Sequence, residues 1–183
     1  LGTFPGPPYK INLKPNSQPF CNRPYNIPHA IKPIAKREID RLVKNGVLRK
    51  IHFSRSGAPC MFLPKKNGGV RFVTDFRKLN LQIQRHPYPL PDIKDVLHKM
   101  EGFTYATCLD VNMGYYHTLL DKHSQEICSI ILPWGKYCYT RLPQGLNCSP
   151  DVFQERMDSI FSDMEHVFCY IDNFHFMNNL NNT

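Results

Sequence analysis

The sequence has no apolar run long enough to cross a membrane and no recognisable secretory signal. No stretch of its 183 residues approaches the roughly 20 apolar residues that a membrane-spanning helix needs. The opening LGTFPGPPYK lacks the basic start and apolar stretch of a signal peptide. We therefore expect an intracellular protein that is not secreted and has no membrane partner. An initiator Met is also absent, so we expect a fragment of a longer chain.

The cysteines offer no pattern typical of a disulfide framework or a zinc site. There are seven of them, an odd number, and no C-x-x-C pair occurs. Several lie inside apolar, strand-like runs, which favours buried free thiols. An enzyme that uses a cysteine nucleophile with histidine has candidates in Cys128, Cys138, His117 and His123, but none of the cysteines stands in a recognisable nucleophile context.

Acidic residues are scarce in the first half of the chain. Residues 1–99 contain 19 Lys and Arg against 5 Asp and Glu, whereas residues 100–183 contain 4 against 10. The first part is therefore suited to binding a polyanion, although a solvated surface explains charge alone equally well. The second part concentrates carboxylates that can hold cations. The overall composition, 42% hydrophobic and 21% charged, is that of a globular protein and excludes disorder, collagen and coiled coil.

The first half predicts an extended arm, a helix and a hairpin. Residues 1–28 hold seven of the sixteen prolines and read as an arm. Apolar residues at helical spacing predict a helix from Ala30 to Asn45, which Gly46 would close. Two short apolar runs, residues 59–63 and 70–74, flank an Asn-Gly turn with two lysines and predict a hairpin.

The second half predicts alternating helices and strands. Asp92 as cap indicates a helix over about 92–101, and a buried strand follows at residues 104–111. Residues 126–132 and 136–142 predict a hairpin, and Ser149 is the expected cap of a helix with an apolar stripe. Residues 167–171 and 174–177 predict a last strand pair. The fold class is therefore α+β, with an antiparallel sheet packed on helices.

Two of these strands end by presenting a carboxylate, Asp110 in CLDV and Asp172 in CYIDN. If the strands are neighbours, both carboxylates emerge at one edge of the sheet, where they repel each other unless a cation lies between them. Mg²⁺ prefers such oxygen ligands, and a pair of metal ions suits phosphoryl transfer. Spacing alone leaves the alternative of ordinary turn or cap residues open.

Seven segments in order along the chain carry a resemblance to one family. They are residues 23–48, 56–59, 62–68 with 71–80, 88–93 (YPLPDI), 109–111 (LDV) with 114–116 (GYY), 142–146 (LPQGL) with 149–157 (SPDVFQERM), and 170–173 (YIDN). In this order they resemble the reverse transcriptase domain of gypsy-like LTR retrotransposons. The resemblance implies the fingers and palm of a right-hand polymerase, ending before the thumb. It places the arm at 1–28, the fingers at 29–91 and the palm at 92–183, with part of the fingers inserted at about 120–145.

The resemblance also implies a function, RNA-directed DNA synthesis by two-metal nucleotidyl transfer to a primer 3′-hydroxyl. It implies two Mg²⁺ ions, with Mn²⁺ as a substitute, deoxynucleoside triphosphates, and a primed RNA or DNA template. The intact element would add thumb, RNase H and integrase parts of a polyprotein, and would work in the cytoplasm or in a particle.

The family roles transfer to matching positions of this sequence. Asp110, Asp172 and Asn173 would be the catalytic residues, and Asp110 and Asp172 would hold the metals with the carbonyl of Val111. The remaining roles fall on residues that would bind the nucleotide, Lys65, Lys66, Arg71, Tyr115 and Gln144, and on residues that would contact template or primer, Arg77, Gly145 and Tyr170. Arg77 has a second interpretation, bracing Asp75, which the sequence leaves open.

Asn173 departs from the family pattern, because the motif Tyr-x-Asp-Asp has a second aspartate there. We expect this loss of charge, and the end of the sequence before the thumb, to weaken or abolish activity in a decayed or truncated copy. The alternative is a non-catalytic remnant of a retroelement that still binds nucleic acid through its basic half.

Overall fold

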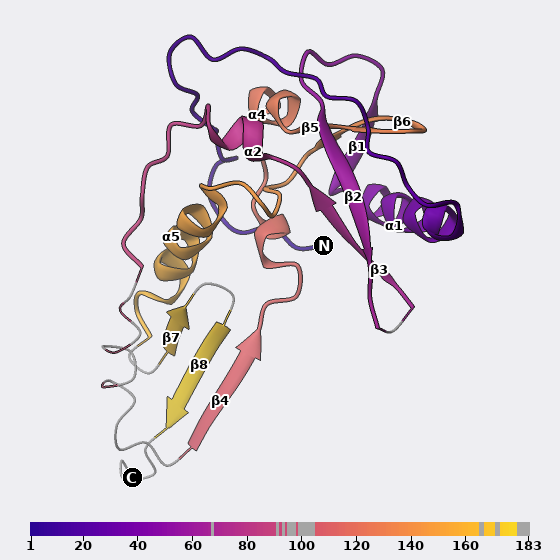
Figure 1. Cartoon of the computed structure of the whole chain (residues 1–183). Coiled ribbons are helices and arrows are strands. Elements are labelled where there is room, and N and C mark those ends of the chain that lie inside the picture. Colours follow the sequence, from indigo (N-terminus) through magenta and orange to yellow (C-terminus); the bar gives the residue numbers. More distant parts are fainter. Residues whose placement is uncertain are drawn as a thin grey trace. The chain divides into compact units, whose positions relative to one another are not determined.

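The computed structural model describes residues 1–66, 68–90, 92, 94, 98, 105–164, 167–170 and 173–178. Its contacts divide the chain into two compact units (Figure 1). The first unit comprises residues 1–85 and 115–149, and the second comprises residues 86–114 and 150–183. The mixed α+β class is confirmed.

The first unit is built on a five-stranded sheet in the order β1-β6-β5-β2-β3. The strands are β1 (Leu48–Ile51), β2 (Ala58–Pro64), β3 (Val70–Thr74), β5 (Ser129–Leu132) and β6 (Gly135–Tyr139). Neighbours are antiparallel except for β2 and β5, which pair in parallel. The sheet is thus antiparallel as predicted except at this one parallel pair. The two strands are far apart in sequence, so no hairpin fixes their relative direction.

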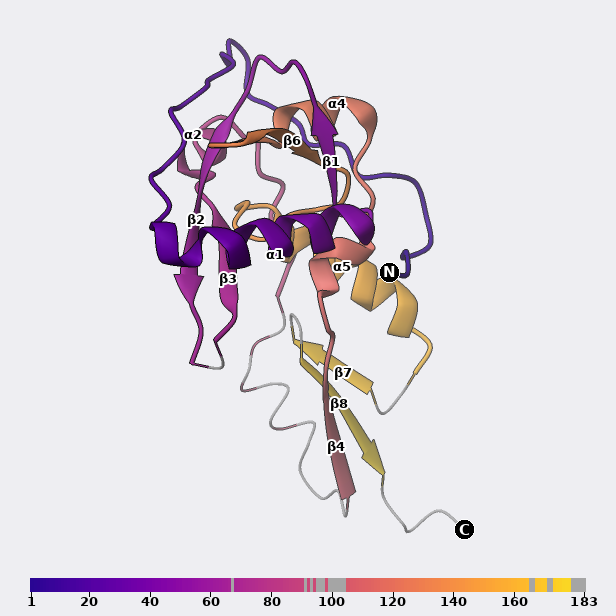
Figure 2. The same cartoon turned by 90° about the vertical axis from the view of Figure 1, so that its right-hand side faces the viewer.

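Helix α1 (Lys32–Lys44) crosses this sheet and contacts both edge strands, β1 and β3 (Figure 2). It follows the short 3₁₀ helix η1 (His29–Ile31). The side chains of Ala35, Ile39 and Leu42, spaced three or four residues apart, are its buried face. The helix ends at Lys44, two residues before Gly46. Gly46 has a φ of 66°, in the left-handed region that favours glycine, as the sequence predicts.

Two predicted hairpins of the first unit are confirmed, and one boundary is wrong. Strands β2 and β3 pair from Cys60↔Thr74 to Pro64↔Val70, and β5 and β6 meet at Leu132↔Gly135. The second hairpin was predicted to start at residue 126, but helix α4 (Lys122–Ile127) occupies that segment. The Asp121 carboxylate caps α4 by accepting from the Ser124 backbone N–H at 2.8 Å, a local signal that outweighs the strand propensity.

The proline-rich arm is extended, as predicted, and its backbone is fixed to the first unit at several points. Isolated bridges join Leu13 to Ile83 and Cys21 to Gly57. The Arg141 guanidinium, which comes just after β6, donates to the Gly2 carbonyl at 2.7 Å. Two further short helices are α2 (Arg77–Asn80) and the 3₁₀ helix η2 (Gly114–His117).

The second unit contains a three-stranded antiparallel sheet in the order β4-β8-β7. The strands are β4 (Tyr105–Asp110), β7 (Val167–Tyr170) and β8 (Asn173–Asn178), and the helix is α5 (Ser149–Phe161). Phe153 and Met157 of the predicted apolar stripe are buried. The Ser149 hydroxyl, expected to cap this helix, instead donates to the Pro143 carbonyl at 2.7 Å.

Strand β4 was predicted to be buried, but all six of its residues are exposed. Tyr105 is 62% exposed and Leu109 is 51% exposed. An uninterrupted apolar run is typical of a strand covered on both faces. Here β4 lies at the edge of the described sheet and pairs only with β8. The apolar run therefore predicts correctly that the segment is a strand, but it does not predict whether the strand is buried.

Some predictions fall outside the described residues. The expected helix over 92–101 is one, although the Lys94 backbone N–H does donate to Asp92 Oδ1 at 2.8 Å, as a capping aspartate requires. Ile171 and Asp172 are further examples.

The cysteines fit the interpretation as buried thiols. None of the seven forms a disulfide, and five of them are buried. In the described ranges, no helix combines the length and the apolar content needed to cross a membrane.

Candidate active site

The register of β4 and β8 places the predicted catalytic segments side by side. Asp110 is the last residue of β4 and pairs with Asn173, the first residue of β8. Asn173 also pairs with Tyr170, the last residue of β7. Asn173, which follows Asp172 in the sequence, therefore lies beside Asp110 in the sheet. The strands expected to be neighbours, β4 and β7, are instead separated by β8.

The metal ligands predicted at this edge are oxygen atoms, which suits a hard divalent ion. The side chain of Asp110 is exposed. The Val111 carbonyl accepts a hydrogen bond from the Gly114 backbone N–H at 3.1 Å, which leaves one of its two lone pairs available. Among the described residues, no group of three His, Cys, Asp or Glu side chains is arranged to hold a metal. Asp172 is not among those residues.

The turn that follows Asp110 is packed tightly against α5. A Cβ atom added to Gly114 would lie 2.9 Å from Cε2 of Phe153 and 3.4 Å from Cγ1 of Val111. Phe153 is fully buried. Only glycine fits this contact without a shift of its neighbours, so the turn that carries Asp110 has a fixed position relative to the helix.

Helix α5 also holds the strand that leads to Asp172. Gln154 is fully buried, and its Nε2 donates to the Cys169 carbonyl of β7 at 3.1 Å and to Asp158 Oδ1 at 2.7 Å. Asp151 is 3% exposed and accepts from the Tyr88 backbone N–H at 3.2 Å. Neither contact is evident from the sequence, because only the fold brings these segments together.

The predicted nucleotide-binding cations lie on and beside the loop between β2 and β3, in the first unit. Lys65 starts this loop, and its backbone N–H donates to the Gly69 carbonyl at 2.8 Å. Lys66 and Arg71 are exposed. Lys65 also lines a small cavity with Arg37 and Arg41 of α1. The predicted roles of these cations stay predictions.

The predicted Gln144–Gly145 loop is also in the first unit, and its backbone requires glycine. Gly145 has a φ of 97°, and a Cβ atom there would meet Phe76 Cδ2 and the Thr74 carbonyl at 3.7 Å. The Asn80 side chain donates to the Gly145 carbonyl at 2.9 Å. Gln144 is exposed, and Tyr115 is half-buried in η2.

A buried group of hydroxyls lies at the end of β3, and sequence reasoning did not identify it. The hydroxyls of Thr74 and Tyr139 are 2.9 Å apart, and the ring of Tyr116 is stacked on that of Tyr139 with centroids 6.3 Å apart. Burial raises the pKa of Tyr116 to about 12. This group adjoins the Gly145 turn, because the Thr74 carbonyl is one of the atoms nearest to it.

The structure assigns one of the two roles considered for Arg77. Its guanidinium donates to both carboxylate oxygens of Asp75, at 2.9 and 2.7 Å. The Tyr25 hydroxyl from the arm donates to Asp75 Oδ2 at 2.7 Å. Arg77 therefore braces Asp75, while its side chain stays 84% exposed. Contact of Arg77 with template stays a prediction. So does the primer contact of Tyr170, whose side chain is not described.

Asp75 gives the stability of the first unit a specific pH dependence. Hydrogen bonds from Arg77, and also from Tyr25, hold the pKa of the Asp75 carboxyl well below its usual range. A depressed pKa in the folded state adds stability above the ordinary value of about 3.9, and this stability is lost as the pH falls below it. In urea denaturation from pH 6 to pH 2.5, we expect Asp75→Asn to destabilise the chain at pH 6 and to flatten the profile below pH 4.

The matched control for this prediction is Asp40→Asn, which changes an exposed carboxyl on α1. It should leave both the stability at pH 6 and the profile close to those of the native chain. An unchanged profile for Asp75→Asn would contradict the assignment of the Arg77–Asp75 pair as a stabilising contact.

The division into two units separates the charges. The first unit carries 20 Lys and Arg against 5 Asp and Glu, a net charge of +15. The second carries 3 against 10, a net charge of −7. The candidate metal ligands thus belong to the acidic unit, and the cations predicted to bind phosphates belong to the basic one.

Comparisons with known proteins agree on one family. A family model described as reverse transcriptase (RNA-dependent DNA polymerase) matches residues 63–182. The chain is 31% identical over 173 residues to the retrovirus-related Pol polyprotein from transposon 412 of Drosophila melanogaster, covering 90% of this chain and 14% of that protein. It is 30% identical over 167 residues to the transposon Tf2-7 polyprotein of Schizosaccharomyces pombe, covering 90% and 12%.

Solved structures with a similar fold belong to a viral enzyme. A crystal structure of a prototype foamy virus protease-reverse transcriptase mutant superposes with a TM-score of 0.88 at 26% identity, covering 97% of this chain and 24% of that one. The foamy viral enzyme in complex with an RNA/DNA hybrid gives 0.84 at 26% identity, covering 98% and 24%. The chain therefore spans about a quarter of these proteins and about an eighth of the curated polyproteins.

Proposed function

Because the chain belongs to the reverse transcriptase (RNA-dependent DNA polymerase) family, we propose that it carries the metal-binding part of an RNA-directed DNA polymerase. The observation that supports this most is the pairing of Asp110 with Asn173 across β4 and β8. One residue of this pair comes from each of the two segments that resemble the family's catalytic motifs, residues 109–116 and 170–173. The resemblance to gypsy-like elements is confirmed by the relatedness to retrotransposon polyproteins.

Asp110, Asp172 and the Val111 carbonyl would hold two Mg²⁺ ions, or Mn²⁺ in their place. When bound, the metal ions stabilise the charge that develops on the phosphoryl group and activate the primer 3′-hydroxyl. The chain's own part is to fix the ligands. Gly114 lets the turn after Asp110 pack closely against Phe153 of α5. The Gln154 side chain of α5 donates a hydrogen bond to the backbone of β7.

Residues of the basic unit would bind the other reactants. Lys65, Lys66 and Arg71 supply positive charge for a triphosphate, Tyr115 would pack under the deoxyribose, and Gln144 would contact the nucleotide. The template and primer would be RNA or DNA, since solved relatives are described in complex with dsDNA and with an RNA/DNA hybrid. Relatedness to retrotransposon polyproteins supports an intracellular location, in the cytoplasm or a particle.

Primer extension on a primed homopolymer RNA template tests the proposal. We expect the native chain to extend the primer slowly in Mg²⁺ and not at all in EDTA. Asp110→Ala should abolish extension, because it removes a metal ligand. Asp163→Ala, which removes an exposed carboxyl just after α5, should extend as the native chain does. Extension that survives Asp110→Ala would contradict the proposal.

A second candidate function is nucleic-acid binding without catalysis. Asn173 favours it, since an amide carries no negative charge where the family motif has a second carboxylate. The net charge of +15 on the first unit supports polyanion binding in either case. Salt-dependent binding of a primed template, with no extension by the native chain or by Asn173→Asp, would favour this second candidate.

A further inference from the structure

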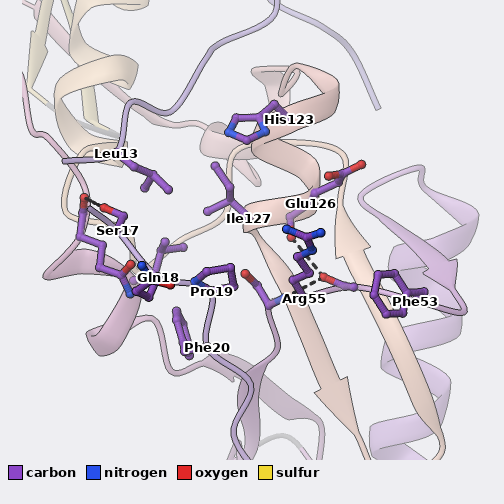
Figure 3. Close-up of a pocket in the computed structure, with 14 residues that line it drawn as sticks. Leu13, Ser17, Gln18, Pro19, Phe20, Phe53, Arg55, His123, Glu126 and Ile127 are labelled. Atoms are coloured by element: carbon purple, nitrogen blue, oxygen red, sulfur yellow. Dashed lines mark hydrogen bonds between the residues drawn. The ribbon is translucent and has the colours of Figure 1, made fainter. Parts of the chain in front are cut away.

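A cavity of about 440 Å³ in the first unit contains none of the residues with a predicted nucleotide or template role (Figure 3). Its walls are residues 13 and 17–20 of the arm, residues 53–56 between β1 and β2, residues 79 and 82 at the end of α2, and residues 123, 126 and 127 of α4. This volume is in the range of small-ligand sites in proteins.

The cavity is lined by both apolar and polar side chains. Leu79 and Ile127 are buried, at 2% and 8% exposure, and the arm adds the half-buried ring of Phe20. Ser54, Ser56 and the amides of Gln18 and Gln82 supply hydrogen-bonding groups. Such a combination fits a flat, partly polar ring better than an aliphatic chain, because a ring has an apolar face and hydrogen-bonding edges.

Phe53 at the rim is the most exposed large apolar residue described, at 81%. A single exposed Phe is common on protein surfaces. This one, however, lies in the segment RKIHFSR, where Arg49, Lys50, His52 and Arg55 are all exposed as well. An exposed ring with arginine and lysine close by in the sequence is suited to stacking on a base and to contacting the backbone of a single strand.

The loop that carries Phe53 is held in place by hydrogen bonds. The Ser54 hydroxyl donates to the Glu126 carbonyl at 3.4 Å and accepts from the Ser56 backbone N–H at 3.1 Å. Lys136 Nζ donates to the Ser54 carbonyl at 3.1 Å. On the other wall, the Gly57 backbone N–H donates to the Phe20 carbonyl at 2.8 Å. A ligand would therefore meet two walls that are already positioned, which lowers the entropic cost of binding.

Two side chains of opposite charge line the cavity without pairing. Arg55 and Glu126 form no salt bridge among the described residues, and their side chains extend on the same side of the cavity (Figure 3). Arginine is suited to a phosphate group. A carboxylate in a basic surface would repel phosphates, but it accepts hydrogen bonds from the amino groups of bases.

We propose that this cavity binds one unpaired nucleobase of a single-stranded nucleic acid. Phe53 stacks on the base, Arg55 contacts a neighbouring phosphate, and Glu126 accepts from an exocyclic amino group. Bases in a duplex are paired and stacked, so only a single strand can present one. The inference takes the class of partner from the proposed function, and it needs neither metal nor catalysis.

Photo-cross-linking of the full chain locates the bound base. A short single-stranded oligocytidine carrying 5-iodocytosine is irradiated with the chain, which is then digested with trypsin. We expect the cross-link in the peptide Ile51–Arg55, which contains Phe53 and which trypsin releases by cutting after Lys50 and Arg55. Cross-links confined to other peptides would overturn the inference.

Fluorescence anisotropy with labelled oligocytidine separates stacking from phosphate contact. Phe53→Ala should weaken binding about tenfold without changing its salt dependence. Arg55→Ala should lower the slope of log K against log salt by about 0.7. Leu81→Ala, which shortens an apolar side chain that is 74% exposed and does not line the cavity, is the matched control and should bind normally.

The ligand preference tests the role of Glu126. The native chain should bind oligocytidine more tightly than oligouridine, which lacks the amino group, and Glu126→Gln should reduce this difference. Binding that Phe53→Ala leaves unchanged would overturn the inference and leave the proposed function intact. No binding of single strands or of primed template would contradict both.

Discussion

Asn173→Asp is expected to raise Mg²⁺-dependent primer extension by about 10- to 100-fold, the range found when groups that support a metal site are changed. The main chain of Asn173 lies directly across from that of Asp110. The substitution therefore restores a carboxylate at the edge that carries the candidate metal ligands. A second carboxylate there increases the attraction for divalent cations, because ligand charge sets much of the affinity.

The same strand provides the control. Asn178→Asp makes the same change of charge at the other end of β8, where residue 178 pairs with Tyr105. Five residues of strand separate the two positions, about 17 Å. Asn178→Asp should leave extension at the native rate. Equal rates for Asn173→Asp and the native chain would show that a lost carboxylate at residue 173 does not limit activity.

Gly114→Ala is expected to destabilise the second unit by about 1–3 kcal/mol, the usual cost of overpacking. The new methyl group would lie 2.9 Å from Cε2 and 3.0 Å from Cζ of Phe153, which is fully buried and cannot move freely. The φ of Gly114 is not in the left-handed region, so the crowded contact alone causes the effect. The midpoint of urea denaturation measures it.

A second substitution distinguishes this contact from a general effect on the turn. Phe153→Leu removes the ring atoms that crowd the new methyl group, at a cost of its own from lost packing. In the double variant, the two losses should be less than additive, since each change relieves part of the other. Strictly additive losses would contradict the contact between residue 114 and the ring.

Much of the fold was predictable because local patterns decide it. The hairpin of β2 and β3 is bounded by a glycine-containing turn, and Gly46 ends α1 with a left-handed φ. The sequence pattern gave wrong predictions where the result depends on a strand's position in the sheet. The apolar β4 is an exposed edge strand, and the parallel pairing of β2 with β5 joins segments about 70 residues apart. Neither feature is encoded in a short window of sequence.

The sequence predicts that Asp110 lies at the end of a strand, as it does in the structure, but it does not predict the contacts that hold this strand end in place. The strand that ends in Asp110, β4, pairs with β8, which begins at Asn173, whereas β7, which ends at Tyr170, is separated from β4 by β8. The contact of Gly114 with Phe153, and the hydrogen bond from Gln154 to β7, depend on how α5 packs. Sequence spacing carries no information on such contacts, because they join segments that meet only in the folded chain.

Titration with Mn²⁺, followed by electron paramagnetic resonance, tests the central claim most directly, because it requires neither template nor catalysis. If the edge of β4 and β8 binds divalent metal, the free Mn²⁺ signal should fall on addition of native chain and stay high with Asp110→Ala. Asp163→Ala should bind as the native chain does, and Mg²⁺ should compete for the site. Equal Mn²⁺ binding by the native chain and Asp110→Ala would contradict the assignment of this edge as the metal site.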